Sequence, residues 1–106
     1  MKTYKVNSWG TEYEVCLSTG TRYYYGDNLA IWMYIADTGE PFATLTVNLD
    51  GELPKNQAYV DTNNCPWAER FIQEHGIGKF LNRYGNSGFC QYPLYEFDME
   101  KINGES

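Results

Sequence analysis

The fold is decided by the stretch LAIWMYIADTGEPFATLTVNL, residues 29–49. Its first part, residues 29–36, is apolar on both faces, which is typical of a central β-strand. Its last part, residues 42–49, alternates between an aliphatic face and a mixed aromatic and polar face. Between the two parts, residues 37–41 supply turn chemistry, including a glycine that is free to take a positive φ. The stretch therefore predicts two antiparallel strands joined as a hairpin.

Weaker strand patterns lie on both sides of this hairpin. Apolar and polar residues alternate around Tyr4 and again around Val15, and residues 57–61 are a further short strand candidate. Residues 89–99 read as a last strand that Pro93 interrupts. Because proline cannot donate to a strand ladder, this last strand is predicted to lie at a sheet edge or to carry a bulge there.

One main helix is predicted over residues 65–75. Pro66 suits the first helical turn, where its missing N–H costs nothing, and either Asn64 or Cys65 would be the N-cap. Gly76 stops the helix, and the apolar residue after it supplies the contact of a Schellman motif. The segment thus carries both a start and a stop signal.

Together these elements predict an α+β fold in a single domain, residues 1–106. The expected architecture is a twisted antiparallel sheet of five to six strands, with the main helix packed on one face. Residues 78–84 are a candidate for a short second helix. The tail after Lys101 is expected to fray.

Composition and charge narrow the class of function. The chain of 106 residues is 42% hydrophobic and has a net charge of −6. It shows no apolar run long enough to span a bilayer and no signal peptide, so the cytoplasm is the expected compartment. The negative charge argues against direct binding to nucleic acid or to membranes, and favours a partner with a basic surface.

The chain offers little for catalysis. A Cys65 nucleophile is conceivable, but His75 lies at the other end of the predicted helix, roughly 15 Å away along its axis. The spacing of the three cysteines and the one histidine matches no metal motif, and no glycine-rich loop has a phosphate-binding context. We therefore expect no enzyme, no cofactor and no metal, while an enzyme that uses Cys65 stays an alternative.

Aromatic side chains form the first candidate binding surface. Trp32, Tyr34 and Phe42 are expected to share the sheet face opposite the helix. An aromatic patch with little charge is typical of the centre of an interface. Two alternatives stay open, since the protein itself, including residues 23–25, or a second copy in a homodimer could cover this face.

Acidic side chains form the second candidate. Asp37 and Glu40 flank the hairpin turn, and Glu96, Asp98 and Glu100 alternate along the predicted last strand. Carboxylates at alternate strand positions are about 6.6 Å apart, so such a row can imitate a run of phosphates. The alternative is a solvated strand face.

Three stretches of the sequence resemble a known family: residues 39–49 (GEPFATLTVNL), residues 60–67 (VDTNNCPW) and the segments RYG, SGF and YPLY within residues 83–95. They are similar to a family of small proteins of uncharacterised function that bacterial conjugative elements and phages carry. The resemblance spans about residues 1–97 and supplies no catalytic residue. It implies a mobile-element setting, in which many small acidic proteins block CRISPR or restriction complexes.

These observations lead to one expected function and two alternatives. The expectation is an anti-defence protein, most specifically an anti-CRISPR inhibitor, that binds a basic surface of a protein or ribonucleoprotein defence complex. Its carboxylates would compete with phosphate, and its aromatic rings would add apolar contact. The alternatives are an accessory or homodimeric interaction module of the element, and an enzyme with a Cys65 nucleophile.

Overall fold

The structure is a computed structural model that describes residues 2–20, 28–49 and 51–103. The described chain forms the strands β1 (Tyr4–Ser8), β2 (Thr11–Gly20), β3 (Ala30–Ile35), β4 (Pro41–Thr44), β5 (Thr46–Val47), β6 (Gln57–Val60), β7 (Gly78–Ser87) and β8 (Cys90–Phe97). Its helices are α1 (Ala68–His75) and α2 (Met99–Ile102). The fold is therefore mostly β with two short helices. Residues 23–25, which were expected as a possible cover for the aromatic face, lie outside the described residues.

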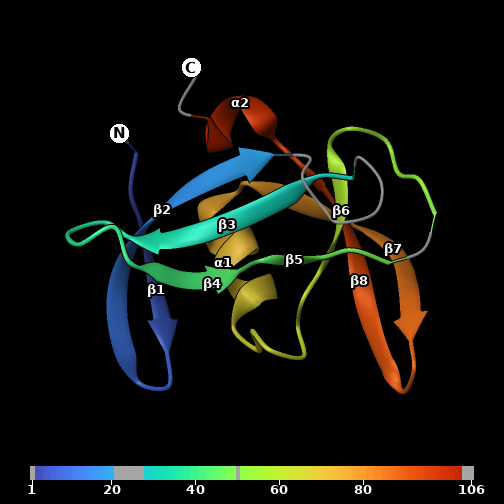
Figure 1. Cartoon of the computed structure of the whole chain (residues 1–106), viewed down its shortest axis with the longest axis horizontal. Helices are drawn as coiled ribbons and strands as arrows, with labels where there is room; N and C mark the ends of the chain where they lie inside the picture. The colour runs from blue at the N-terminus through green and yellow to red at the C-terminus, as the bar shows by residue number, and fades with distance from the viewer. Residues whose placement is uncertain (1, 21–27, 50, 104–106) are drawn as a thin grey trace.

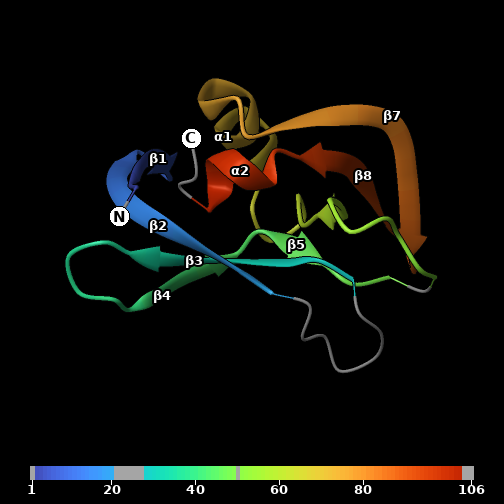
Figure 2. The same cartoon turned by 90° about the horizontal axis from the view of Figure 1, so that it is seen from above.

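The strands form two antiparallel sheets instead of the predicted single sheet of five to six strands. Sheet A has the order β1-β2-β3-β4, and sheet B has the order β5-β6-β8-β7. Figure 1 shows the two sheets at opposite ends of the molecule, and Figure 2 shows both helices on one side of β3 and β4. The antiparallel pairing and the hairpin of β3 and β4 are confirmed, whereas the prediction of one continuous sheet is wrong.

The two sheets are joined at Leu45, where the predicted strand of residues 42–49 divides. The Leu45 N–H donates to the Ile31 carbonyl, and the Leu45 carbonyl accepts from the Asp61 N–H, each over 2.9 Å. Leu45 itself is fully buried. The chain therefore changes pairing partners at a residue whose side chain anchors both sheets, while the sequence alternation continues through it.

Helix α1 begins later than predicted, at Ala68 instead of Cys65. Its N-cap is Trp67, which makes no side-chain capping bond. Asn64 is engaged before the helix, since its backbone N–H and its side-chain amide donate to the two carboxylate oxygens of Asp61 over 3.2 and 2.9 Å. The prediction of an Asn64 or Cys65 cap is therefore wrong, because Asp61 organises the turn that leads into the helix.

The end of α1 is confirmed as a Schellman motif. Gly76 has a φ of 60°, and its N–H donates to the Gln73 carbonyl over 3.2 Å. The Ile77 N–H donates to the Ile72 carbonyl over the same distance, and both isoleucine side chains are fully buried. The apolar contact of the motif thus connects the helix end to the core.

We expect Gly76→Ala to lower the free energy of unfolding by about 1 kcal/mol, because alanine resists a positive φ. The new Cβ would meet only the end of the flexible Lys101 side chain, at 3.1 Å, so the backbone effect dominates. Urea unfolding measures the change. An unchanged midpoint would show that the φ at this position carries no cost.

The predicted second helix after α1 is strand β7 instead. Phe80 pairs with Tyr95 and Tyr84 pairs with Pro93, and the register shifts between these two pairs. Asn82, inside the shift, has a positive φ of 59°. The irregularity therefore lies in β7, where residues 81–83 oppose Leu94 alone, and the bulge predicted in the last strand at Pro93 is wrong. β8 lies between β6 and β7 and is not an edge strand, although its pairing with β6 ends at Leu94, before Pro93. Pairing with β8 has overridden the local helical pattern.

The last strand is shorter than predicted, because it ends at Phe97. The Asp98 carboxylate accepts from the Lys101 N–H over 3.2 Å and caps α2. Ile102 in this helix is buried, and the Tyr4 hydroxyl donates to the Lys101 carbonyl over 3.2 Å. The chain therefore stays packed past Lys101, as far as Ile102.

Candidate functional site

Strand β3 presents Trp32 and Tyr34 on the face of sheet A that is opposite the core. Ile31 and Met33, at the alternating positions, are buried, whereas Trp32 and Tyr34 are half-buried. The two aromatic side chains help to line a shallow groove of about 150 Å³, which Thr44 also lines. This part of the predicted aromatic surface is where the sequence placed it.

The position of Trp32 depends on a glycine in the neighbouring strand. A Cβ built on Gly20 would lie 2.9 Å from Cζ3 of the Trp32 ring, closer than real Cβ atoms come to other atoms. The indole therefore lies against the bare backbone of β2. Its orientation is set by sheet A itself, which makes it a preformed part of the surface.

Phe42 lines the same groove as Trp32 and Tyr34, but its ring also packs against the core, which the sequence did not predict. Its ring centroid lies 5.0 Å from that of Tyr13 and 5.6 Å from that of Trp67, at the N-cap of α1. The cause is a register shift between β3 and β4. This irregularity lets Phe42 pack against the core, where it bridges sheet A and the helix.

The predicted row of Glu96, Asp98 and Glu100 does not form. Glu96 belongs to β8, where it pairs in register with Lys79 on one side and Gln57 on the other. Asp98 caps α2, and Glu100 lies in the first turn of that helix. Strand alternation therefore stops before the second carboxylate, and the three side chains do not make a periodic row.

Carboxylates do gather at one end of sheet A. Glu12 and Glu14 occupy alternate, exposed positions on β2, about 6.6 Å apart along the strand. They share a face with Tyr34, because Tyr34 pairs with Cys16, the next residue in the same alternation. Glu12 and Glu14 were not among the predicted site residues, although their spacing at alternate positions of a strand pattern was a visible signal.

The turn between β3 and β4 adds two more carboxylates beside this pair. The Ala36 N–H donates to the Glu14 carbonyl over 2.9 Å, which places the turn next to β2. Asp37 and Glu40 are both exposed, and Gly39 between them has the expected positive φ, 75°. We name the combined surface the acidic–aromatic face; its residues are Glu12, Glu14, Trp32, Tyr34, Asp37 and Glu40.

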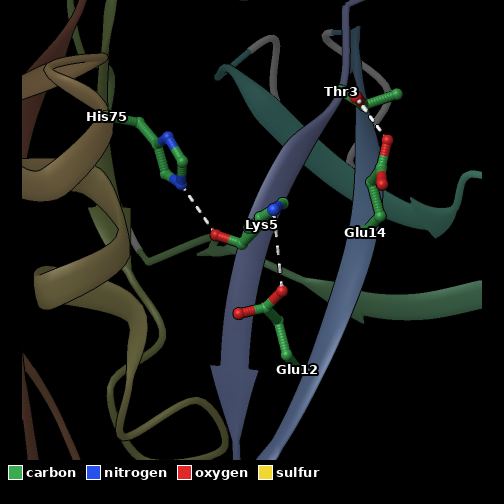
Figure 3. Close-up of polar contacts among 5 residues, drawn as sticks. All are labelled: Thr3, Lys5, Glu12, Glu14 and His75. Atoms are coloured by element: carbon green, nitrogen blue, oxygen red, sulfur yellow. Dashed lines mark hydrogen bonds and ion pairs between the residues drawn. The ribbon is translucent and has the colours of Figure 1, made fainter.

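Figure 3 shows the immediate partners of the two β2 carboxylates. The Thr3 hydroxyl donates to Glu14 over 2.8 Å, and Lys5 Nζ lies 3.9 Å from a Glu12 carboxylate oxygen. Both side chains of the ion pair are mostly exposed, so the pair adds little to stability and is easily exchanged for another partner. Both carboxylates therefore stay exposed, and their contacts within the chain are weak enough to be exchanged for those of a partner.

The geometry around Cys65 and His75 does not support a nucleophilic site. Cys65 is buried and its thiol donates to the Thr44 carbonyl over 3.7 Å. Burial, reinforced by the Asp61 carboxylate, raises the pKa of this thiol to about 11. His75 is engaged elsewhere, since its Nε2 lies 2.7 Å from the Lys5 carbonyl oxygen (Figure 3). A thiol with a raised pKa is a poor nucleophile at neutral pH.

We expect Cys65 in the folded protein to react with iodoacetamide at pH 8 about 100-fold more slowly than in the urea-unfolded chain, because its thiolate is that much rarer. The variant Cys16→Ser/Cys90→Ser isolates this thiol. Because the pKa of the Cys65 thiol is raised in the folded state, the free energy of unfolding should not depend on this thiol below about pH 9. It should then decrease as the pH rises toward 11, where the unfolded chain ionises the thiol more readily. Equal reaction rates in the folded and unfolded protein would show that the Cys65 thiol is not suppressed by folding, and would support the alternative of a Cys65 nucleophile.

Residues 2–20, 28–49 and 51–103 contain no group of three or more His, Cys, Asp or Glu side chains that could hold a metal ion. Neither described helix is long and apolar enough to cross a membrane.

Comparison with known proteins gives one match. Residues 16–104 match the family described as "Domain of unknown function (DUF4313)". The match includes Trp32, Tyr34, Asp37 and Glu40 of the acidic–aromatic face, while Glu12 and Glu14 precede it. The searches of curated proteins and of solved structures return no match.

Proposed function

We propose that this chain, which belongs to the DUF4313 family of domains of unknown function, is a non-catalytic binding protein. Its acidic–aromatic face would dock on a basic surface of a macromolecular partner. The observation that carries this proposal is the gathering of Glu12, Glu14, Asp37 and Glu40 at the end of the sheet face that also presents Trp32 and Tyr34.

The electrostatics favour a basic partner over other kinds. The whole chain has a net charge of −6, and the only described ion pair on this face is the exposed contact between Lys5 and Glu12. A surface on which carboxylates outnumber cations attracts a positively charged partner and speeds its association. The two half-buried aromatic rings then offer apolar area that a rigid sheet already holds in place.

We propose a defence complex of the bacterial host as this partner, with an anti-CRISPR role as the most specific form. Such complexes act in the cytoplasm and hold nucleic acid in basic channels, where carboxylates spaced about 6.6 Å apart could compete with phosphates. This choice of partner rests on the expectation, drawn from the resemblance of residues 39–49 and 60–67, that the chain belongs to a mobile element.

The test is binding to purified, guide-loaded CRISPR effector complexes and to restriction enzymes. The variant Glu12→Gln/Asp37→Asn/Glu40→Gln removes three exposed charges from the face. We expect it to bind the cognate complex roughly 10- to 100-fold more weakly than the wild type at low salt, with a smaller salt dependence.

The matched control is Glu52→Gln/Glu74→Gln/Glu100→Gln, which removes the same number of exposed charges from outside the face. It should bind within a few-fold of the wild type. Equal losses in both variants would mean that only the net charge matters. Failure of the wild type to bind any complex in the panel, and to protect incoming phage DNA in cells, would exclude the anti-defence role.

A second candidate function is a homodimeric accessory module. The groove lined by Trp32, Tyr34 and Thr44 favours it, since a second copy could cover these rings. Light scattering would then show a dimer that Trp32→Ser dissociates. A monomer at all concentrations up to the millimolar range would dismiss this candidate.

A further inference from the structure

The hairpin of β1 and β2 ends in a tryptophan that the rest of the chain hardly covers. Ser8 pairs with Thr11, so Trp9 and Gly10 form a two-residue turn between them. Trp9 is 86% exposed. Its φ is 55° and that of Gly10 is 81°. Two positive φ values at the central positions identify a type I′ turn, for which Asn-Gly is the favoured sequence.

Tryptophan is an unfavourable residue at this position. The left-handed region is reached easily by glycine and asparagine, but for a bulky residue it is a genuine outlier. The hairpin of β7 and β8 gives a direct contrast. In that turn the positive φ of 60° is at Gly88. The aromatic residue Phe89 is fully exposed but does not have a positive φ. Trp9 therefore combines backbone strain with a nearly complete lack of burial, and neither stabilises the fold.

The charges near Trp9 indicate which kind of partner could bind it. Residues 6–11 carry no charge, and the first carboxylates of the acidic–aromatic face, Glu12 and Glu14, follow on the same hairpin. In Figure 1 this tip projects beyond sheet A at the end of the molecule away from α2. The exposed Trp9 thus lies three residues before the first of these carboxylates in the chain, at the tip of the hairpin that carries them.

We propose that Trp9 is the anchor of the binding surface and inserts into an apolar pocket beside the basic region of the partner protein. This inference rests on the proposed function and adds the specificity element to it. Tryptophan is the residue type most enriched among the side chains that dominate interface energetics, and its burial removes roughly 150–250 Å² from water. A lipid surface fits less well, because the adjacent carboxylates and the net charge of −6 are repelled by anionic headgroups.

The test is the variant Trp9→Asn, which installs the favoured type I′ sequence. We expect two opposite effects in one protein. The melting temperature should rise by about 5 °C, because the strain at the turn is relieved. Affinity for the effector complex that binds the wild type should fall at least 10-fold. A merely structural tryptophan could not give both results.

The matched control is Phe89→Ser, which removes an equally exposed aromatic ring from the tip of the other hairpin. Its affinity and melting temperature should stay close to those of the wild type. Full affinity in Trp9→Asn would overturn the anchor while leaving the proposed function intact. An unchanged or lower melting temperature would overturn the strain argument without reference to any partner. Trp9-dependent binding to vesicles of phosphatidylcholine and phosphatidylglycerol would assign the tip to a membrane and overturn the proposal.

Discussion

Replacing Phe71 with alanine should lower the free energy of unfolding by about 3–5 kcal/mol. Phe71 is 2% exposed and lies at the centre of an aromatic cluster. Its ring centroid is 6.0 Å from that of Tyr4, 6.1 Å from Trp67 and 4.8 Å from His75. The side chain thereby connects α1 with the edge strand β1, and its loss would leave a cavity between them.

The expected loss is a large part of the total, since a domain of this size is stable by roughly 5–15 kcal/mol. Urea unfolding followed by tryptophan fluorescence measures it. Phe89→Ala is the control, because Phe89 is fully exposed and its truncation should change stability by less than about 0.5 kcal/mol. A loss below about 1 kcal/mol in Phe71→Ala would mean that the helix is not packed on β1 as described.

Gly85→Val should lower the free energy of unfolding by about 1–3 kcal/mol through overpacking. A Cβ at this position would lie 2.6 Å from Cδ1 of Leu49 and 2.7 Å from Cε1 of the Tyr59 ring. Both distances are below any that real Cβ atoms tolerate, and the rigid tyrosine ring cannot move as easily as a leucine methyl group. The segment after β5 therefore packs directly on the backbone of β7.

Asn86→Val is the control for Gly85→Val, because Asn86 is the next, exposed residue of the same strand. Valine favours strands, so this variant should keep or slightly raise stability. If both substitutions had the same effect in urea unfolding, the close approach of Leu49 and Tyr59 to Gly85 would have no energetic meaning.

Local sequence patterns predicted those elements whose contacts are between residues close together in the sequence. The hairpin of β3 and β4 follows from two apolar patterns and a turn, and the end of α1 follows from Gly76 and Ile77. The pairing of strands that are far apart in the sequence could not be predicted from such local signals. The alternation of residues 42–49 would be the same if they formed one strand in one sheet or, as in the structure, two strands in different sheets that meet at Leu45. Likewise, β7 forms because β8 offers a partner, which its own sequence does not reveal.

The candidate site was predictable in part, for the same reason. Trp32 and Tyr34 were placed correctly by strand alternation, and Asp37 and Glu40 by the turn. The packing of Phe42 against the core was not predicted, because a register shift between β3 and β4 has no signature in single-residue alternation. The row after Glu96 failed, because Asp98 was read as a strand residue although aspartate is also a favoured helix cap.

The most direct test of the binding account is carboxyl footprinting of the protein in complex with its effector. Carbodiimide-activated labelling with glycine ethyl ester, read by mass spectrometry, reports the accessibility of each carboxylate. We predict that Glu12, Glu14, Asp37 and Glu40 are protected in the complex, while Glu52, Glu74 and Glu100 are labelled as in the free protein. Protection of the second group, with the first group labelled at its free rate, would contradict the account.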